Sequence, residues 1–321
     1  MSTIQEIPYN SVFHKTPKKD KTTVKDYLNN IKKIIYKSYK KDISVRTLER
    51  HYSKFRSQIF KEELNYTTDI QISNKRFMHI VLPDVHVPFE NELILNGILE
   101  LLGEYQDKIA SFTILGDFID GLGFSKHNLN QVPLKDYSMG IEYKKGNFWL
   151  NKFDMFLDPE VEKNFLYGNH EDRYTRFMSD INNSVLNGAV KSPEEALNLK
   201  ERGYNVKTNW KNDYFRIVDI DIFHGQYVNE YATKTHIMKN KGNVMFGHTH
   251  RVATLNTGQF KGYNIGFLGD ILSPGFDYVS RFEKGDWRNA FSIISKINNK
   301  SVVTVIECVD NKFAFGGKIY G

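Results

Sequence analysis

The 321-residue sequence contains a single cysteine, Cys308. One thiol cannot form a disulfide within the chain, and a cage of several thiolates around a structural zinc ion is excluded. No apolar run approaches the roughly 18–20 residues that a membrane-spanning helix needs. The first residues, MSTIQEIPYNSVFHKTPKKDK, lack the continuous apolar core of a signal peptide. No internal repeat or low-complexity tract is present. We therefore expect a cytoplasmic protein with no membrane partner.

The composition is that of a globular protein with a basic surface. Hydrophobic residues make up 40% and charged residues 26% of the chain, so a substantial core can form. The net charge of +6 permits an acidic partner such as nucleic acid, although a soluble enzyme with a mildly basic surface would show the same value. The abundance of Lys, Asn and Ile is typical of an AT-rich genome such as that of a phage.

We expect three segments: a polar, lysine-rich arm over residues 1–21, a small helical domain over residues 22–70, and the main domain over residues 75–321. In the second segment, TTVKDYLNNIKKIIYKSYKK has apolar residues at three- and four-residue steps, which predicts an amphipathic helix. A second helix, SVRTLERHYSKFRSQIFKEEL, follows, with Ser44 as its N-cap. Two helices joined by a short polar turn resemble a helix-turn-helix.

The second of these helices carries a basic face formed by Arg46, Arg50 and Lys54, which follow one another at four-residue steps. Such a face can contact the phosphates of DNA. The alternative is a helical hairpin whose charges are simply solvated, because no base-reading pattern is visible. Both interpretations stay open.

The main domain repeats one pattern five times: VLPDVH, ILGDFID, FLYGNHED, IFHG and MFGHTHR each place Asp, Asn or His directly after a short apolar run. The runs predict buried strands, and ligands bind at the carboxyl ends of strands in α/β sheets. We further predict a helix from the N-cap Ser192 to Gly203 and a strand over YFRIVDIDIFHG. The late runs AFSIISKIN and SVVTVIECV are expected as antiparallel strands of a second sheet.

In this order, the five blocks resemble the calcineurin-like metallophosphoesterase superfamily, from about Phe77 to beyond His250. The resemblance implies an α/β fold, a β-sandwich flanked by helices, with two divalent metal ions. It implies that the first ion is held by Asp84, His86 and His250, the second by Asn169, His224 and His248, and that Asp117 bridges them. His170 would stand beside the metals as the general acid, and Asp120 would orient it.

The ligand types agree with this assignment. Carboxylates, an amide oxygen and imidazoles favour Mn²⁺, with Fe, Zn²⁺, Ni²⁺ or Mg²⁺ as alternatives. Two ions about 3.5–4 Å apart need a shared ligand, and the carboxylate of Asp117 has two oxygens for it. We expect a metal-bound hydroxide to attack the phosphorus atom and His170 to protonate the leaving group.

Other contacts are less defined. His127, Arg173 and Arg251 are candidates for binding the substrate, and Arg251 has a structural role as its alternative. The protein-phosphatase branch of the superfamily has an early arginine after GDxxD, where this chain has Lys126 and His127. Glu171 and Asp172 either support the ligands or are acids at the start of a helix.

Three functions are compatible with these residues. The first is a DNA nuclease to which the N-terminal helices deliver the substrate. The second is a phosphomonoesterase acting on phosphoprotein or a nucleotide. The third, an inactive DNA-binding or scaffold protein, fits poorly with a complete ligand set. The physiological metal, the choice between DNA and RNA, and the oligomeric state are not determined by the sequence.

Overall fold

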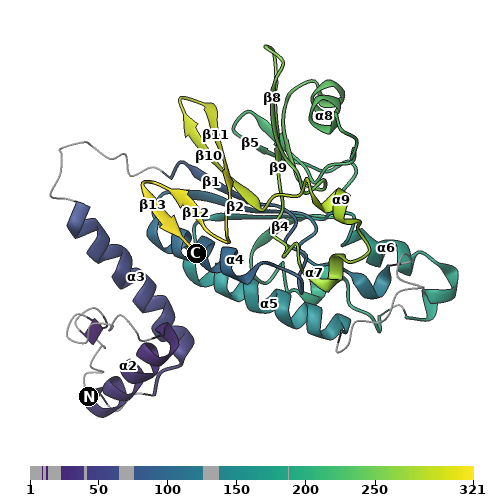
Figure 1. The fold of residues 1–321 in the computed structure, drawn as a ribbon. Coiled ribbons are helices and arrows are strands. Elements are labelled where there is room, and N and C mark those ends of the chain that lie inside the picture. Colours follow the sequence, from purple (N-terminus) through teal and green to yellow (C-terminus); the bar gives the residue numbers. More distant parts are fainter. Residues whose placement is uncertain are drawn as a thin grey trace.

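The computed structural model describes Tyr9 and residues 12–13, 23–39, 42–64, 76–125, 137–186 and 188–321. Of residues 56–64 and 184 it describes the backbone alone. The main domain consists of two stacked β-sheets with helices outside them, and a pair of helices precedes it (Figure 1). No helix within the described ranges is long and apolar enough to cross a membrane.

The first sheet has six strands in the order β11-β10-β1-β2-β3-β4. Their bounds are Lys300–Glu307 for β11, Ala290–Ile297 for β10, Met78–Leu82 for β1, Ile109–Leu115 for β2, Glu162–Leu166 for β3 and Tyr204–Lys207 for β4. Strands β1 to β4 are parallel, whereas β10 runs antiparallel to β1, and β11 antiparallel to β10. The carboxyl ends of β1, β2 and β3 therefore lie at one edge.

Both faces of the central strands β1 and β2 are buried, and side-chain alternation decides what each face contacts. Ile80 and Leu82 of β1 pack in the core that includes residues of helices α4 (Glu92–Glu104) and α5 (Met139–Phe156). Val81, between them, points to the opposite face and packs against the second sheet. A strand buried on both faces has a continuous apolar sequence, which is why the run HIVL predicts a strand without strict alternation.

The second sheet has the order β5-β6-β7-β9-β8. Its strands are β5 (Phe215–Ile217), β6 (Ile220–Ile222), β7 (Asn243–Phe246), β9 (Lys261–Ile265) and β8 (Val252–Asn256). Strands β6, β7 and β9 are parallel to one another, and helix α8 (Ala232–Asn240) contacts β7, β8 and β9. The predicted fold class, a helix-flanked β-sandwich in an α/β domain preceded by helices, is confirmed.

Shorter elements complete the domain. Helices α6 (Asp172–Met178), α7 (Pro193–Ala196) and α9 (Arg281–Lys284) and the 3₁₀ turns η1 (Leu122–Phe124), η3 (Ile181–Leu186) and η4 (Pro274–Phe276) lie in the loops. Strands β12 (Phe313–Phe315) and β13 (Lys318–Tyr320) form a separate hairpin.

Three element predictions were wrong. The late strands β10 and β11 do not belong to the second sheet, because β10 pairs with β1 and extends the first. The run YFRIVDIDIFHG forms a hairpin, β5–β6, because Val218 adopts a left-handed conformation with φ 57° and reverses the chain. Helix α7 begins at the predicted Ser192 cap but ends at Ala196, and Asn198 then has φ 52°. The edge strand β8 was not predicted.

The preceding helices are α2 (Val24–Tyr39) and α3 (Val45–Leu64). They share a small core of their own, and Val12 and Phe13, from the segment predicted as a polar arm, are buried in it. The backbone N–H of Thr47 donates to the hydroxyl of Ser44 over 3.1 Å, which confirms the predicted N-cap. Whether the pair acts as a helix-turn-helix stays a prediction.

The proposed DNA-binding side chains of α3, Arg46, Arg50 and Lys54, are all exposed. Helix α3 also contacts α4 and α5 of the main domain. A cavity of about 990 Å³ lies between these helices, and Arg46 lines it together with Lys152 of α5. Arg46 therefore lies beside the main domain, although its side chain is exposed.

Candidate metal centre

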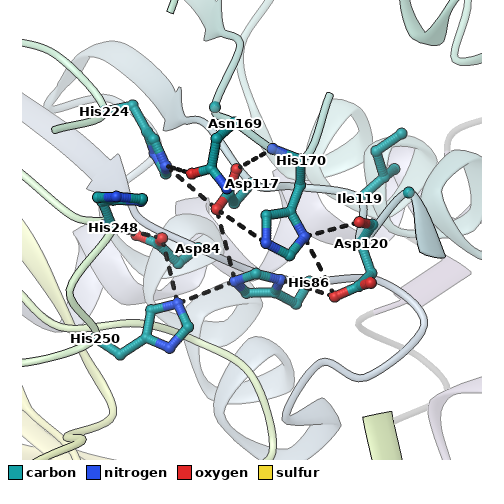
Figure 2. A network of polar contacts seen from close by, with 12 residues as sticks. Asp84, His86, Asp117, Ile119, Asp120, Asn169, His170, His224, His248 and His250 are labelled. Atoms are coloured by element: carbon teal, nitrogen blue, oxygen red, sulfur yellow. Dashed lines mark hydrogen bonds and ion pairs between the residues drawn. The ribbon is translucent and has the colours of Figure 1, made fainter. Parts of the chain in front are cut away.

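The ligand residues predicted from the sequence converge where the two sheets bring their parallel strand ends together (Figure 2). Each follows a strand within a few residues: Asp84 and His86 follow β1, Asp117 follows β2, Asn169 follows β3, His224 follows β6, and His248 and His250 follow β7. The predicted catalytic residues Asp120 and His170 lie beside them, after β2 and β3. One sheet thus contributes the carboxylates, the amide and two imidazoles, and the other contributes the remaining three imidazoles.

The backbone of these loops is strained at the ligands themselves. Asp84, His86, Asp117, His248 and His250 have positive φ values between 43° and 64°. Non-glycine residues seldom adopt this conformation, and each instance costs about 1–3 kcal/mol unless the surroundings impose it. Such clusters of strained residues are typical of functional sites.

Two glycines allow the loops to approach one another. A Cβ atom at Gly168 would overlap the carboxylate of Asp117, and one at Gly247 would overlap the carboxylate of Asp84. Because a side chain at either position would displace a carboxylate, glycine is required there by close packing.

One group of ligand atoms belongs to Asp84, His86 and His250, whose atoms lie within 4.8 Å of one another. The Nε2 atoms of His86 and His250 are 3.1 Å apart, and Nε2 of His250 is 3.5 Å from Oδ1 of Asp84. Both oxygens of Asp84 also accept from the backbone N–H of His248, at 3.0 Å, so the carboxylate is held in place.

A second group joins Asp117, His224 and His248, again within 4.8 Å. Nε2 of His224 lies 3.0 Å from the amide oxygen of Asn169 and 3.2 Å from Oδ2 of Asp117. The structure thus brings all seven predicted ligands close together. The ligand atoms of His86, Asp117 and His170 also lie within 4.8 Å of one another. Which of these residues bind a metal stays a prediction.

Asp117 lies between the groups. Its Oδ1 accepts from the backbone N–H of His170 over 2.9 Å. Its Oδ2 faces His224 at 3.2 Å and His86 at 3.9 Å. We expected both oxygens to be available for bridging. Because Oδ1 already accepts a hydrogen bond, Oδ2 is the oxygen that faces histidines of both groups.

The hydrogen bonds behind the imidazoles determine which nitrogen faces the centre. Nδ1 of His86 donates to Oδ2 of Asp120 over 3.1 Å, and Nδ1 of His224 donates to the carbonyl of Leu115 over 3.0 Å. When these rings are neutral, the lone pair of Nε2 is therefore left toward the centre, as in histidines that bind a metal.

These residues fit a pair of divalent cations. The atoms that converge are acceptors: carboxylate oxygens, an amide oxygen and imidazole lone pairs, all in a buried place. Burial raises the pKa of Asp84 to about 7, and the nearby Asp117 adds to this. Burial lowers the pKa of His250 to about 3. Several buried acceptors that face one another repel, and a cation between them would offset their desolvation.

His170 lies beside the two groups, with Nε2 3.7 Å from Oδ2 of Asp117. Its Nδ1 donates to the backbone carbonyl of Asp120 over 2.7 Å, and its Nε2 accepts from Arg173 over 3.0 Å. Burial lowers the pKa of His170, but the carboxylates of Asp117 and Asp120 outweigh burial and raise it above its usual value. In this arrangement Arg173 covers the nitrogen that faces the centre.

The carboxylate of Asp120 contacts His86, His170 and Arg173. It lies 3.1 Å from Nδ1 of His86, 3.4 Å from Nδ1 of His170 and 3.3 Å from Nη1 of Arg173. We predicted that this side chain orients His170. In the structure the shorter contact with His170 comes from the backbone carbonyl of Asp120, and the carboxylate is closest to His86. Although burial opposes it, His170 and His86 hold the pKa of Asp120 well below its usual range.

Glu171 has a clearer role than its sequence context indicated. It precedes α6, but its buried carboxylate makes no helix cap. Instead it accepts from the backbone N–H groups of Asp117 (2.9 Å), Ile119 (3.0 Å) and Gly168 (2.8 Å). Glu171 thereby ties the loop after β2 to the loop after β3. Its position directly after Asn169 and His170 was the one available signal.

Glu142 of α5 was not found by sequence reasoning, because nothing distinguishes it within a helix. It is fully buried and accepts from the N–H of Gly121 and from the hydroxyl of Tyr137, each over 2.5 Å. Burial, with Asp120 adding to it, raises the pKa of Glu142 to about 8. Glu142 anchors the turn that directly follows Asp120.

The remaining predicted site residues lie elsewhere. The guanidinium of Arg251 donates to the backbone carbonyls of Val228 and Asn229, which agrees with the structural alternative for this residue. His127 is outside the described residues. Arg173, in contrast, is at the centre through His170 and Asp120.

No protein-family model matches the chain, and no curated protein matches it. Solved structures do. Wild-type Vps29 complexed with Zn²⁺ from Entamoeba histolytica is 15% identical over 75% of this chain and 95% of that one, with a TM-score of 0.38. Vacuolar Protein Sorting 29 from Cryptosporidium parvum is 15% identical over 74% and 94%, with a TM-score of 0.40. A conserved uncharacterized protein from Streptococcus pneumoniae, described as a predicted phosphoesterase, is 11% identical over 72% and 89%, with a TM-score of 0.29. Similarities this distant do not decide an activity.

Proposed function

We propose that this protein is a metal-dependent phosphoesterase and that its substrate is a phosphodiester, most directly DNA. The observation that carries the proposal is the pair of adjacent ligand groups, with Oδ2 of Asp117 facing His224 of one group and His86 of the other, and with His170 and Arg173 next to them. A shared carboxylate between two groups of acceptors is the arrangement that two-metal hydrolysis of phosphate esters requires.

Asp84, His86, Asp117 and His250 would hold one divalent ion, and Asp117, Asn169, His224 and His248 the other. Bound there, the ions would supply Lewis acidity, which activates water and neutralises the charge that builds on the phosphate oxygens. Mn²⁺ is our first choice because the donors are nitrogen and oxygen atoms only, and Fe, Zn²⁺, Ni²⁺ and Mg²⁺ are the alternatives.

His170 supplies the proton. An alkoxide leaving group needs one as the P–O bond breaks, and Nε2 of His170 is the nitrogen that faces the centre. In the structure this nitrogen lies 3.0 Å from the guanidinium of Arg173, which can only donate, so this hydrogen bond and a proton on Nε2 exclude each other. For His170 to act as the acid, Arg173 has to leave it, and a phosphate oxygen is the natural new acceptor for the guanidinium. Arg173 would then hold the substrate while His170 takes up a proton.

The choice of DNA rests on charge and on the N-terminal helices. The chain carries +6 net, and Arg46, Arg50 and Lys54 present exposed cations on α3. A phosphomonoesterase acting on phosphoprotein or a nucleotide is the second candidate, since Arg173 beside the centre would suit a terminal phosphate as well as a diester.

The decisive experiment uses purified protein stripped with chelator and reloaded with Mn²⁺. It is assayed in parallel on bis(4-nitrophenyl) phosphate, 4-nitrophenyl phosphate, and supercoiled, linear and single-stranded DNA. We expect hydrolysis of the diester and of DNA that is lost with EDTA and restored by Mn²⁺. Hydrolysis of the monoester alone would move the assignment to the second candidate, and no metal-dependent hydrolysis of any of the five would refute a phosphoesterase.

A further inference from the structure

The segment of residues 274–288, which contains η4 and α9, forms a wall of the metal centre. At one end the ring of Phe276 meets the ring of His86 edge-on, with centroids 5.3 Å apart. At the other end Trp287 meets His250 at 4.3 Å, and the N–H of Arg288 donates to the carbonyl of His250 over 2.8 Å. Both ends of this segment are therefore fixed to ligand residues.

Between these fixed ends, two aromatic side chains face solvent. Phe282 is 86% exposed and Tyr278 is 49% exposed. Single exposed apolar residues are common on protein surfaces. Here, however, two aromatic rings lie on one short segment whose ends contact the centre, while the neighbouring Phe276 is fully buried. Among the aromatic side chains of the segment, those that contact the ligands are buried or half-buried, and the two between them are exposed.

Phe282 is presented by an ordered turn. The hydroxyl of Ser280 accepts from the N–H of Glu283 over 3.2 Å, and the carboxylate of Glu283 accepts from the N–H of Ser280 over 3.1 Å. This capping box closes α9 around Phe282. The guanidinium of Arg281 lies 5.9 Å from the centre of the Phe282 ring, so a cation accompanies the exposed ring.

Tyr278 lies two residues after Phe276, whose ring contacts the ring of His86. Burial of its hydroxyl group raises its pKa to about 12, and the carboxylate of Asp120 adds to this while Arg173 opposes it. The hydroxyl therefore stays a neutral hydrogen-bond donor at any ordinary pH.

We propose that Tyr278 and Phe282 form a stacking platform for unpaired nucleobases next to the scissile phosphate, so that the preferred substrate is single-stranded nucleic acid. The inference rests on the proposed function, since the phosphate must lie at the metal centre. Flat rings with a nearby arginine bind bases of any sequence, because every base has a π-face, and each stacked base contributes about 1–3 kcal/mol. In a duplex the bases are stacked on one another and their faces are not available.

The competing occupant is an apolar part of a protein substrate, and Leu272 distinguishes the two. Leu272 is 88% exposed on the chain just before this segment. An apolar protein partner would use its side chain as readily as that of Phe282, because burial of apolar area does not require a ring. A nucleobase would use Phe282 and not Leu272.

The test measures binding of a single-stranded oligonucleotide, made with cleavage-resistant phosphorothioate linkages and containing 2-aminopurine, to the full chain loaded with Mn²⁺. Stacking quenches 2-aminopurine fluorescence. We expect Phe282→Leu, which keeps an apolar side chain but removes the ring, to weaken binding about 10-fold and to relieve the quenching. Phe282→Trp should bind the oligonucleotide and quench its fluorescence as the wild type does. Leu272→Ala should also keep the affinity and the quenching of the wild type.

Equal losses in Phe282→Leu and Leu272→Ala would overturn the platform in favour of a protein partner. Wild-type-like binding by Phe282→Leu, or no binding of the oligonucleotide by the wild type, would overturn it as well. The proposed function is scored separately, by Mn²⁺-dependent hydrolysis of bis(4-nitrophenyl) phosphate by the wild type. If that hydrolysis is present and the oligonucleotide result is negative, the platform alone fails.

Discussion

Several side chains at the centre are held in place by a hydrogen bond through one of their polar atoms. Nδ1 of His86 donates to Asp120, and Nδ1 of His224 donates to the carbonyl of Leu115. Oδ1 of Asp117 accepts from the N–H of His170. Each has one atom left, and these atoms face one another. A substitution that changes only the remaining atom therefore tests the centre without disturbing its supports.

Asp117→Asn is such a change. If the amide keeps its oxygen toward His170, an NH₂ group replaces Oδ2 and turns a shared acceptor into a donor. We expect the variant to hold fewer than two ions per chain and to lose more activity than the roughly 10–100-fold that an outer-shell partner contributes. Elemental analysis after gel filtration measures the number of ions per chain, and the assay on bis(4-nitrophenyl) phosphate measures the loss of activity. Retention of two ions would contradict a shared ligand.

His170→Ala separates the acid from the ligands. The variant should keep both ions and hydrolyse substrates with alkoxide leaving groups roughly 10²–10⁴-fold more slowly. Its defect should be smaller on 4-nitrophenyl esters, because nitrophenolate leaves without a proton. Rates on a series of leaving groups provide the measurement. A defect of the same size across the series would count against the acid role.

Glu171→Gln tests the support of the loops. Gln has one acceptor where Glu has two, so at least one of the three backbone N–H groups bonded to Glu171 loses its partner. We expect a loss of roughly 1–3 kcal/mol in the free energy of unfolding, measured with urea, and weaker metal binding. Asp172→Asn is the matched control, since its partner is the exposed Arg176 at 3.1 Å and such a pair contributes less than about 1 kcal/mol. Equal effects of the two variants would remove the positioning role.

At the scale of elements, α5 controls the turn that follows Asp120. The contact runs through Glu142, which accepts from Gly121 and from Tyr137, and Tyr137 in turn accepts from the N–H of Gly123 over 3.0 Å. A buried acid here connects a helix of the outer layer to a loop of the centre. Asp120 and Glu171 are the charged groups whose negative charge disfavours its ionised form.

This arrangement predicts a pH dependence for Glu142→Gln. The pKa of Glu142 is about 8 in the folded protein and 4.5 as its ordinary value, so folding favours the protonated form. Its contribution to stability is complete below about pH 4.5 and is lost as the pH rises through about 8. Glutamine resembles the protonated acid and does not titrate. From pH 5 to 7.5 the variant should gain on the wild type by up to roughly 1.4 kcal/mol per pH unit in urea unfolding. A difference that stays constant with pH would contradict the raised pKa.

At the scale of the whole molecule, the N-terminal helices pack against the helices of the main domain. Helices α2 and α3 have their own core, and α3 contacts α4 and α5 on the side of the first sheet away from the second. If the pair delivers DNA, its basic residues raise affinity without taking part in hydrolysis. Arg46, which lines the cavity beside Lys152, should contribute less than Arg50 and Lys54.

Replacement of Arg46, Arg50 and Lys54 by Gln tests this delivery. Each phosphate contact contributes about −0.9 to the slope of log K against log salt on duplex DNA, so the slope should flatten by up to roughly 2–3. Replacement of Lys25, Lys33 and Lys37 on α2 removes the same charge and is the matched control. Filter binding over a range of salt concentrations measures both. If both triple variants change the slope alike, general charge and not a DNA-binding face of α3 is responsible.

Several features of this protein are determined by local sequence. The run HIVL, the cap at Ser44 and the blocks that place Asp84, Asp117, Asn169 and His248 after apolar runs each depend on neighbouring residues, and the strands and turns they predict are present. Strand ends in parallel sheets meet at one edge, so side chains that follow neighbouring strands were expected to lie close together. Which side chains of the two sheets converge was implied only by the resemblance of the ordered blocks to a known superfamily.

Other features were decided only by tertiary structure. The pairing of β10 with β1, the engagement of Oδ1 of Asp117, and the buried carboxylates of Glu142 and Glu171 all depend on contacts between residues far apart in the chain. Periodicity shows that a residue faces a core or solvent but not which partner it meets there. The hydrogen bonds of a buried polar group depend on those partners, because desolvation forces it to use whatever donors the fold brings near.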